Sequence, residues 1–203
     1  MIFDIKIFSD YICPFCYVGK GLVGRLKEEF TIRDEWINIE IHPDTPQEGV
    51  LLTEKFPGMT TEQLFAGVRR AGALYGIAFG QVDKLANSRQ AIEASEYARE
   101  HGKFEEFHDL VLHAYFTEAR DIGAVSVLLE LARQAGLDAE ELQRALEEGR
   151  YAASLEAAQE QAYQYGVSGT PTFIVNNKYR VVGAQSLESF RSVLKRIEEE
   201  ETD

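Results

Sequence analysis

The two cysteines of this chain constrain its fold more than any other feature of the sequence. Cys13 and Cys16 are its only cysteines, and they stand as Cys-x-x-Cys between an apolar run and a segment with helical periodicity. That spacing places both sulfurs on one side of the first turn of a helix. Unpaired backbone N–H groups and the helix dipole favour negative charge there, so we expect the pKa of Cys13 to lie below that of a free thiol. The pair therefore indicates a reactive dithiol at the start of a helix.

Two neighbours of the pair fit a helix start. Pro14 loses no hydrogen bond in the first turn, because the N–H group at that position has no intrahelical partner. Asp10 stands three residues before Cys13 and is within reach of its proton. An aspartate at such a position more often caps the turn or the helix, and we expect that structural role.

Two accidental buried thiols, or half of a zinc site, are the alternative interpretations of the cysteine pair. No second Cys-x-x-Cys and no nearby His-x-His completes a set of zinc ligands. His108 and His113 are five residues apart on a predicted helix, and at ~100° per residue they point roughly 140° away from each other. They make a poor metal pair, so we expect no metal.

The charge balance excludes several classes of partner. The chain has 34 acidic and 21 basic residues and a formal net charge of −13, which repels phosphate backbones and anionic lipid surfaces. We therefore expect no nucleic-acid or membrane partner.

Residues 1–6 enter a strand pattern directly, with no signal-peptide pattern before them. These features predict a cytoplasmic protein, in which a cysteine pair is more often catalytic than structural.

The N-terminal segment has the pattern of a β-α-β unit. Residues 2–9 and 35–42 alternate between apolar and polar side chains, and this period of two predicts strands. Residues 14–30 carry an apolar stripe with helical spacing between them. Three glycines interrupt this helix, and each weakens it by roughly 1 kcal/mol relative to alanine; they are Gly19, Gly21 and Gly24. Close packing against a neighbouring element, or a kink, would explain the glycines.

Helix signals fill the middle of the chain, and no good strand appears between residues 60 and 165. Thr60 with Gln63 forms a capping-box pattern, which predicts the start of a helix, and Tyr75-Gly76 is typical of a helix end. Asn87 or Ser88 can cap a second helix. The further helices are expected over residues 103–116, 121–136, 138–149 and 150–165.

Strand character returns after residue 166. Residues 172–175 and 179–182 flank Asn176-Asn177-Lys178, a sequence typical of a tight hairpin turn. Ser186 then precedes a final amphipathic helix. The chain thus closes with a β-β-α unit.

The order β-α-β, helical block and β-β-α predicts an α/β protein. We expect a thioredoxin-like fold into which an all-helical domain is inserted. The thioredoxin-like domain is placed at residues 1–56 and 166–203, and the inserted helical domain at residues 57–165.

Four motifs carry a family resemblance that extends over nearly the whole chain. They are residues 9–20 around the cysteines, the Asn87-Ser88 helix start, residues 166–173 (Gly-Val-Ser-Gly-Thr-Pro-Thr-Phe) and residues 182–185 (Val-Gly-Ala-Gln). In these motifs the chain resembles the DsbA-like thioredoxin family, and within it the FrnE-type proteins. The resemblance implies a thiol–disulfide oxidoreductase that acts on protein or peptide thiols and disulfides without an organic cofactor. Cys13 would be its attacking thiolate and Cys16 its resolving thiol.

The same resemblance assigns residues to substrate binding. In thioredoxin-like folds the proline that matches Pro171 is cis and lies beside the Cys-x-x-Cys. The residue before it, here Thr170, can pair with an extended substrate backbone. Pro14 and Phe15, between the cysteines, complete the expected substrate-binding residues. DsbA has a histidine in this dipeptide, and Phe15 cannot donate a hydrogen bond to a thiolate, so we expect a less depressed pKa at Cys13 than in DsbA.

Two alternatives to the oxidoreductase stay open. Kappa-class glutathione transferases and 2-hydroxychromene-2-carboxylate isomerases look similar, but they place serine where Cys13 stands and use bound glutathione. The presence of both cysteines favours the redox branch over such a glutathione-dependent enzyme. The other alternative is a non-enzymatic redox sensor or thiol-dependent holdase. Glutathione as a partner, and a homodimer as the oligomeric state, are also left open.

Overall fold

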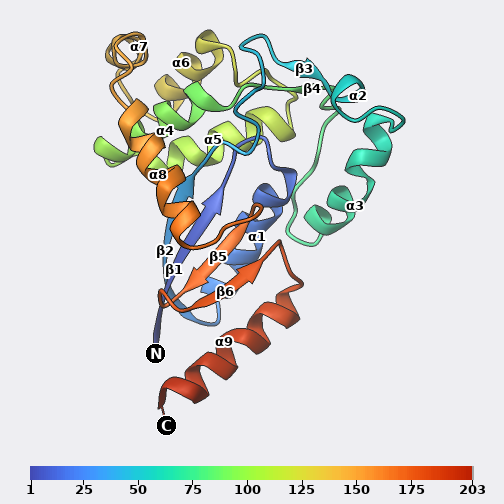
Figure 1. Cartoon of the computed structure of the whole chain (residues 1–203), viewed down its shortest axis with the longest axis vertical. Coiled ribbons are helices and arrows are strands. Elements are labelled where there is room, and N and C mark those ends of the chain that lie inside the picture. Colours follow the sequence, from blue (N-terminus) through green and yellow to red (C-terminus); the bar gives the residue numbers. More distant parts are fainter. Residues whose placement is uncertain (203) are drawn as a thin grey trace.

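The computed structural model describes residues 1–202; Asp203, the last residue of the predicted range 166–203, lies outside the described residues. A central sheet is surrounded by helices, with α4 to α7 gathered at one end of the sheet and α9 at the other (Figure 1). The elements in chain order are β1 (Ile2–Ser9), α1 (Pro14–Lys27), β2 (Thr31–Asn38), β3 (Val50–Leu51), α2 (Leu52–Lys55), α3 (Thr61–Ala73), β4 (Lys84–Leu85), α4 (Arg89–Glu100), α5 (Phe104–Phe116), α6 (Val125–Gln134), α7 (Ala139–Glu147), α8 (Ala152–Gln164), β5 (Thr172–Val175), β6 (Tyr179–Val182) and α9 (Leu187–Thr202).

The sheet has the strand order β2-β1-β5-β6. β1 and β2 run parallel, and α1 provides the crossover that a parallel pair requires. β5 is antiparallel to β1, and β6 is antiparallel to β5. This arrangement joins the β-α-β and β-β-α units into one sheet, and it confirms the predicted thioredoxin-like α/β fold.

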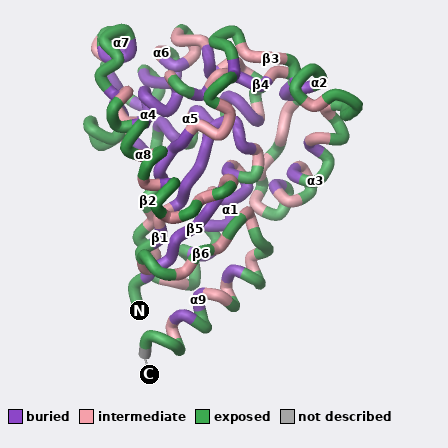
Figure 2. Tube along the Cα trace, viewed as in Figure 1, coloured by how far each residue is buried: buried purple, intermediate pink, exposed green. Residues whose placement is uncertain are grey.

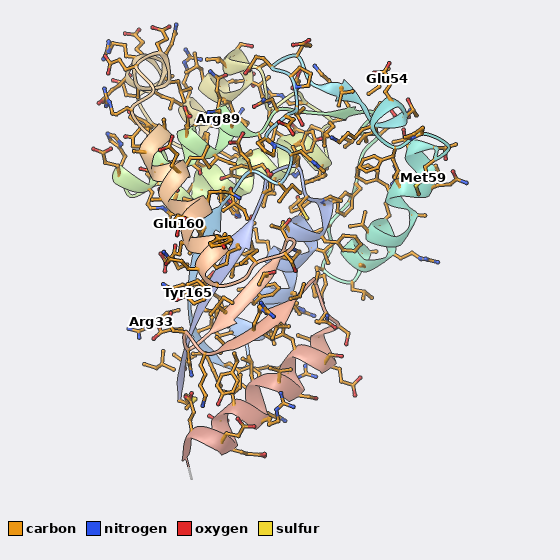
Figure 3. All side chains as sticks on the ribbon, in the orientation of Figure 1. Arg33, Glu54, Met59, Arg89, Glu160 and Tyr165 are labelled. Atoms are coloured by element: carbon orange, nitrogen blue, oxygen red, sulfur yellow. The ribbon has the colours of Figure 1, made fainter. Side chains whose placement is uncertain are left out.

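Different helices cover the two faces of the sheet. On one face, Phe3, Ile5 and Ile7 of β1 pack with apolar side chains of α1 and α9. On the other face, Phe8 packs against α8, and the ring of Tyr165 at the end of that helix lies 5.8 Å from the ring of Phe8 (Figure 3). β1 is consequently the buried middle of the molecule (Figure 2).

A tight turn joins β5 to β6. Its two central residues, Asn176 and Asn177, have φ angles of 51° and 55°, in the left-handed region. The backbone N–H of Lys178 donates to the carbonyl oxygen of Val175 at 3.0 Å. Asparagine tolerates the left-handed conformation, which matches the twist of the flanking strands. The predicted hairpin turn is confirmed.

β2 lies earlier in the chain than the alternation of apolar residues predicted. The sequence predicted a strand over residues 35–42, whereas β2 is Thr31–Asn38. The parallel pairing with β1 sets this register, since Ile2 lies opposite the first residue of β2. Past the end of β2 the chain leaves the sheet, and the backbone N–H of Ile41 donates to the carboxylate of Asp10. The predicted strand bounds were therefore wrong by four residues at each end.

The segment between β2 and β5 contains helices α2 to α8 and the connecting loops, and its strands β3 and β4 pair only with each other. The capping box predicted at Thr60 and Gln63 is present at the start of α3. One apolar cluster includes side chains from α2 to α8, and it also includes Tyr11 and Ile12 from the loop before α1. The helical block thus packs directly on the loop that leads to the cysteines.

Among residues 1–202, no helix combines the length and the apolar character needed to cross a bilayer.

Candidate active site

Cys13 is the N-cap residue of α1, and Cys16 lies within its first turn. Cys13 has an extended backbone, with φ −88° and ψ 109°, and Pro14 is the first helical residue. The thiol of Cys13 donates to the carbonyl oxygen of Thr170, with 3.3 Å between the sulfur and the oxygen. Both cysteines are free thiols. Cys13 is 6% exposed and Cys16 is 0% exposed, so Cys13 is the outer sulfur and Cys16 the inner one.

The two thiols differ in acidity. A hydrogen bond from the Cys16 thiol lowers the pKa of Cys13, and this effect exceeds the opposing effect of burial. Burial raises the pKa of Cys16 well above its ordinary value, and the neighbouring Cys13 raises it further. A thiolate therefore forms first at Cys13, while Cys16 stays protonated. That order suits an attacking sulfur and a resolving sulfur.

Asp10 joins three segments of the chain beside the cysteines. Its fully buried carboxylate accepts hydrogen bonds from the backbone N–H groups of Ile12 and Ile41, at 3.2 and 2.8 Å. The Ser88 side chain, at the start of α4, is a third hydrogen-bond partner. Burial raises the pKa of Asp10 to about 7, although its hydrogen bonds lower it. Asp10 thus caps the turn before Cys13, which is the role that the sequence favoured.

The loop before β5 brings Thr170 and Pro171 to the cysteines, although Cys13 and Thr170 are 157 residues apart in the sequence. The Thr170–Pro171 peptide bond is cis. α1 approaches this loop closely, because a Cβ atom at Gly19 would lie 3.4 Å from Cγ of Pro171. The hydroxyl of Thr170 is buried, and its hydrogen bond to the sulfur lowers the pKa of Cys13. The distance of 3.4 Å at Gly19 is an ordinary van der Waals contact, whereas a Cβ atom at Gly21 would lie 2.5 Å from Cβ of Tyr75, so close packing accounts for Gly21 among the three glycines of α1.

An apolar cavity of about 180 Å³ lies beside Cys13. Cys13 forms part of its wall, and six apolar side chains line it from the loop after β2, from the segment of α2 and α3, and from β4: Ile41, Leu52, Phe56, Leu64, Phe65 and Leu85. Two further lining residues, His42 and Tyr115, carry polar atoms. Burial lowers the pKa of His42, so its imidazole is uncharged at neutral pH. The Tyr115 hydroxyl donates to the carbonyl oxygen of Lys84 at 2.8 Å. Apart from the Cys13 sulfur itself, the described wall of the cavity is therefore uncharged.

The structure also places two of the predicted substrate-binding residues around the outer sulfur. Pro14 lines the apolar cavity. Phe15 is 45% exposed and lies on the surface between the two cysteines. The cysteines, this dipeptide and the Thr170–Pro171 loop thus gather in one region of the molecule.

A contact that the sequence analysis did not identify holds the cysteine loop against α5. Tyr11 is fully buried, and its hydroxyl lies 3.0 Å from Nδ1 of His108. Burial lowers the pKa of His108 to about 3, so the imidazole is neutral. Its ring stacks on that of Phe104, one helical turn earlier, at 5.1 Å. The place of His108 on the apolar stripe of its helix was the available signal for this buried role.

Comparison with known proteins agrees with this geometry. The DSBA-like thioredoxin domain family matches residues 4–195. The uncharacterized protein YwbO of Bacillus subtilis is 29% identical over 196 residues, which are 96% of each chain. The structure of a probable DsbA oxidoreductase, SCO1869 of Streptomyces coelicolor, has a TM-score of 0.87 at 30% identity and covers 96% of this chain and 89% of that one.

A 2-hydroxychromene-2-carboxylate isomerase has a TM-score of 0.76 at 17% identity, over 100% of this chain and 98% of that one. At that identity the likeness concerns the fold alone. The family match covers nearly the whole chain, and it includes both cysteines and the loop before β5. This chain belongs to the DSBA-like thioredoxin domain family.

Proposed function

We propose that this protein is a cytoplasmic thiol–disulfide oxidoreductase whose Cys-Pro-Phe-Cys centre exchanges disulfides with protein or peptide substrates. One observation carries the proposal. Cys13 is the N-cap residue of α1, with its sulfur 3.3 Å from the carbonyl oxygen of Thr170, and Cys16 lies fully buried in the first turn of the same helix. The pKa shifts, downward at Cys13 and upward at Cys16, fit an attacking and a resolving thiol. Family membership and the 30% identity to a probable DsbA oxidoreductase support the same activity.

In the reducing direction, the Cys13 thiolate attacks one sulfur of a substrate disulfide. A bond forms between Cys13 and that sulfur, and the second substrate sulfur leaves as a thiolate. Cys16 then loses its proton and attacks Cys13 Sγ, which breaks the mixed disulfide and releases the first substrate sulfur. The products are a Cys13–Cys16 disulfide and two substrate thiols, so two electrons pass to the substrate. The oxidising direction follows the same steps in reverse.

The loop before β5 has groups that suit a bound substrate. The carbonyl oxygen of Thr170 accepts a hydrogen bond from the Cys13 thiol in the reduced protein. When Cys13 loses its proton, this oxygen becomes free to accept a hydrogen bond from a substrate N–H. The buried Thr170 hydroxyl lowers the pKa of Cys13 through a side-chain hydrogen bond, so it is placed to donate to the Cys13 thiolate. Phe15 offers an exposed apolar surface next to the attacking sulfur. We therefore propose contacts with substrate at Phe15, Thr170 and Pro171, and at Pro14 through the cavity wall.

Turnover of a disulfide or dithiol substrate, compared with turnover of a chromene-type substrate, tests the proposal. The wild-type protein is expected to catalyse insulin reduction or oxidation of a dithiol peptide, and Cys13→Ser and Cys16→Ser are each expected to lose that turnover. Reversible oxidation of the pair without turnover would instead identify a redox sensor. Full activity of Cys16→Ser on a chromene-type substrate with glutathione would contradict the oxidoreductase function and support a glutathione-dependent isomerase instead.

A further inference from the structure

The apolar cavity shares its wall with the sulfur that attacks the substrate. Cys13 is only 6% exposed, and it lines the cavity together with Pro14. A group attached to the sulfur under attack, or next to it, therefore has this cavity within reach. The position of the cavity makes it part of the path that a substrate takes to Cys13.

The α2–α3 segment forms the far wall of this cavity. Phe56 follows α2, and Leu64 and Phe65 lie in the first turns of α3. This segment lies to one side of the sheet (Figure 1), and Met59, in the loop between its two helices, is 44% exposed at its outer end (Figure 3). The apolar side chains of the segment thus face the cysteine, while its outer end faces solvent.

The cavity lacks the groups that would hold a charged substrate. No lysine, arginine or carboxylate side chain lines its described wall. A carboxylate or ammonium group that entered would lose its hydration without gaining an ion pair, which is strongly unfavourable. An apolar group that entered would gain the free energy of leaving water without that cost.

We infer that the preferred substrate of Cys13 carries an uncharged apolar group, on the attacked sulfur or on the residue next to it, which occupies this cavity. This inference rests on the proposed function, since it concerns the disulfide that Cys13 attacks. The substituent on a low-mass disulfide and a side chain next to a peptide cysteine share this chemistry. Glutathione disulfide, with its carboxylates, does not have it.

A homologous series of disulfides measures the effect. The prereduced protein is mixed with dimethyl, diethyl and di-n-propyl disulfide and with glutathione disulfide, and the rate constant for oxidation of Cys13 and Cys16 is recorded. Each rate constant is divided by the rate constant for the reaction of the same disulfide with free dithiothreitol. This ratio corrects for the intrinsic reactivity of the disulfide. Each methylene that moves from water into the cavity is expected to raise the corrected rate constant about fourfold. Glutathione disulfide is expected to fall below the propyl compound.

Variants of one helix provide the control. Leu64→Trp fills the cavity and is expected to remove the dependence on chain length. Leu74→Trp makes the same change at the end of α3, where the side chain is 76% exposed and outside the cavity wall, and it is expected to preserve the dependence. Leu64→Ala enlarges the cavity and is expected to extend the dependence to longer chains, which keeps the test valid if the tryptophan variant does not fold.

A second arm uses disulfides of Cys-Leu and Cys-Ser dipeptides with blocked termini. A higher corrected rate constant for the leucine peptide than for the serine peptide would show that the side chain next to the cysteine occupies the cavity. A dependence on chain length in the alkyl series, without a difference between the peptides, would show that the group bonded to the attacked sulfur occupies it. Equal enhancement of every disulfide, unchanged by Leu64→Trp, would overturn the inference and leave the proposed function standing. No enhancement of any disulfide over dithiothreitol would instead contradict the proposed function.

Discussion

Replacing Asp10 with asparagine is expected to change how the stability of the protein depends on pH. Burial raises the pKa of this carboxyl from 3.8 to about 7 in the folded state. The folded protein therefore holds the proton more tightly than the unfolded chain does. The resulting stabilisation is fully present below pH 3.8 and is lost as the pH rises through 7. At about 1.4 kcal/mol per pKa unit, the loss amounts to about 4 kcal/mol.

His108 has the opposite effect in much of the same range, so the wild-type curve alone does not isolate Asp10. Burial lowers the pKa of His108 from 6.5 to about 3. The unfolded chain then binds a proton that the folded protein excludes, and stability falls as the pH drops from 6.5 towards 3. His108 is present in both the wild type and Asp10→Asn. Its contribution cancels in the difference between their unfolding free energies.

Urea unfolding of the two reduced proteins, measured between pH 4 and pH 8, tests this reasoning. The unfolding free energy of the wild type minus that of Asp10→Asn is expected to fall by about 4 kcal/mol across this range. A difference that stays flat, or that rises with pH, would refute it. Such a result would mean that the N–H groups of Ile12 and Ile41 stabilise the carboxylate more than burial destabilises it.

Three further predictions concern α1. Thiolate absorbance against pH, followed in Cys13→Ser and Cys16→Ser, is expected to give the lower pKa at Cys13. In Cys16→Ser the hydrogen bonds from the Thr170 side chain and from the backbone N–H of residue 16 still lower the pKa of Cys13, whereas burial raises that of Cys16 in Cys13→Ser; a lower pKa at Cys16 would reverse the roles. Gly24→Ala is expected to stabilise the protein by about 1 kcal/mol, since nothing lies within 4 Å of the added Cβ. Gly21→Ala is expected to destabilise it by about 1–3 kcal/mol, because its Cβ would lie 2.5 Å from Cβ of Tyr75. Equal melting temperatures for these two alanine variants would contradict the packing argument.

Local patterns predicted those parts of the fold in which neighbouring residues decide the conformation. The turn at Asn176 and Asn177 depends on residues that tolerate a positive φ, and the start of α3 depends on a side-chain cap at Thr60. The cysteine motif located the start of α1. The likeness to a family then indicated that Pro171 would have a cis bond and lie near this helix, as it does.

Features that depend on distant contacts were not predictable in the same way. The bounds of β2 follow from its pairing with β1, and apolar alternation after Asn38 suggested a strand where the chain has already left the sheet. β3 and β4 are each two residues long, too short to show a period. The cavity beside Cys13 collects side chains from segments that only the tertiary structure brings together. The raised pKa of Asp10 likewise follows from burial, which its neighbours in the sequence do not reveal.

Trapping of a mixed disulfide tests the central claim most directly. In Cys16→Ser, Cys13 can attack a substrate disulfide, but the protein has no other cysteine to release the product. Mass spectrometry of this variant after incubation with a disulfide peptide is expected to show one covalently bound peptide, lost on addition of dithiothreitol. Cys13→Ser is expected to show none. A stable adduct at Cys16 in Cys13→Ser, with none at Cys13 in Cys16→Ser, would contradict the assignment of Cys13 as the attacking sulfur.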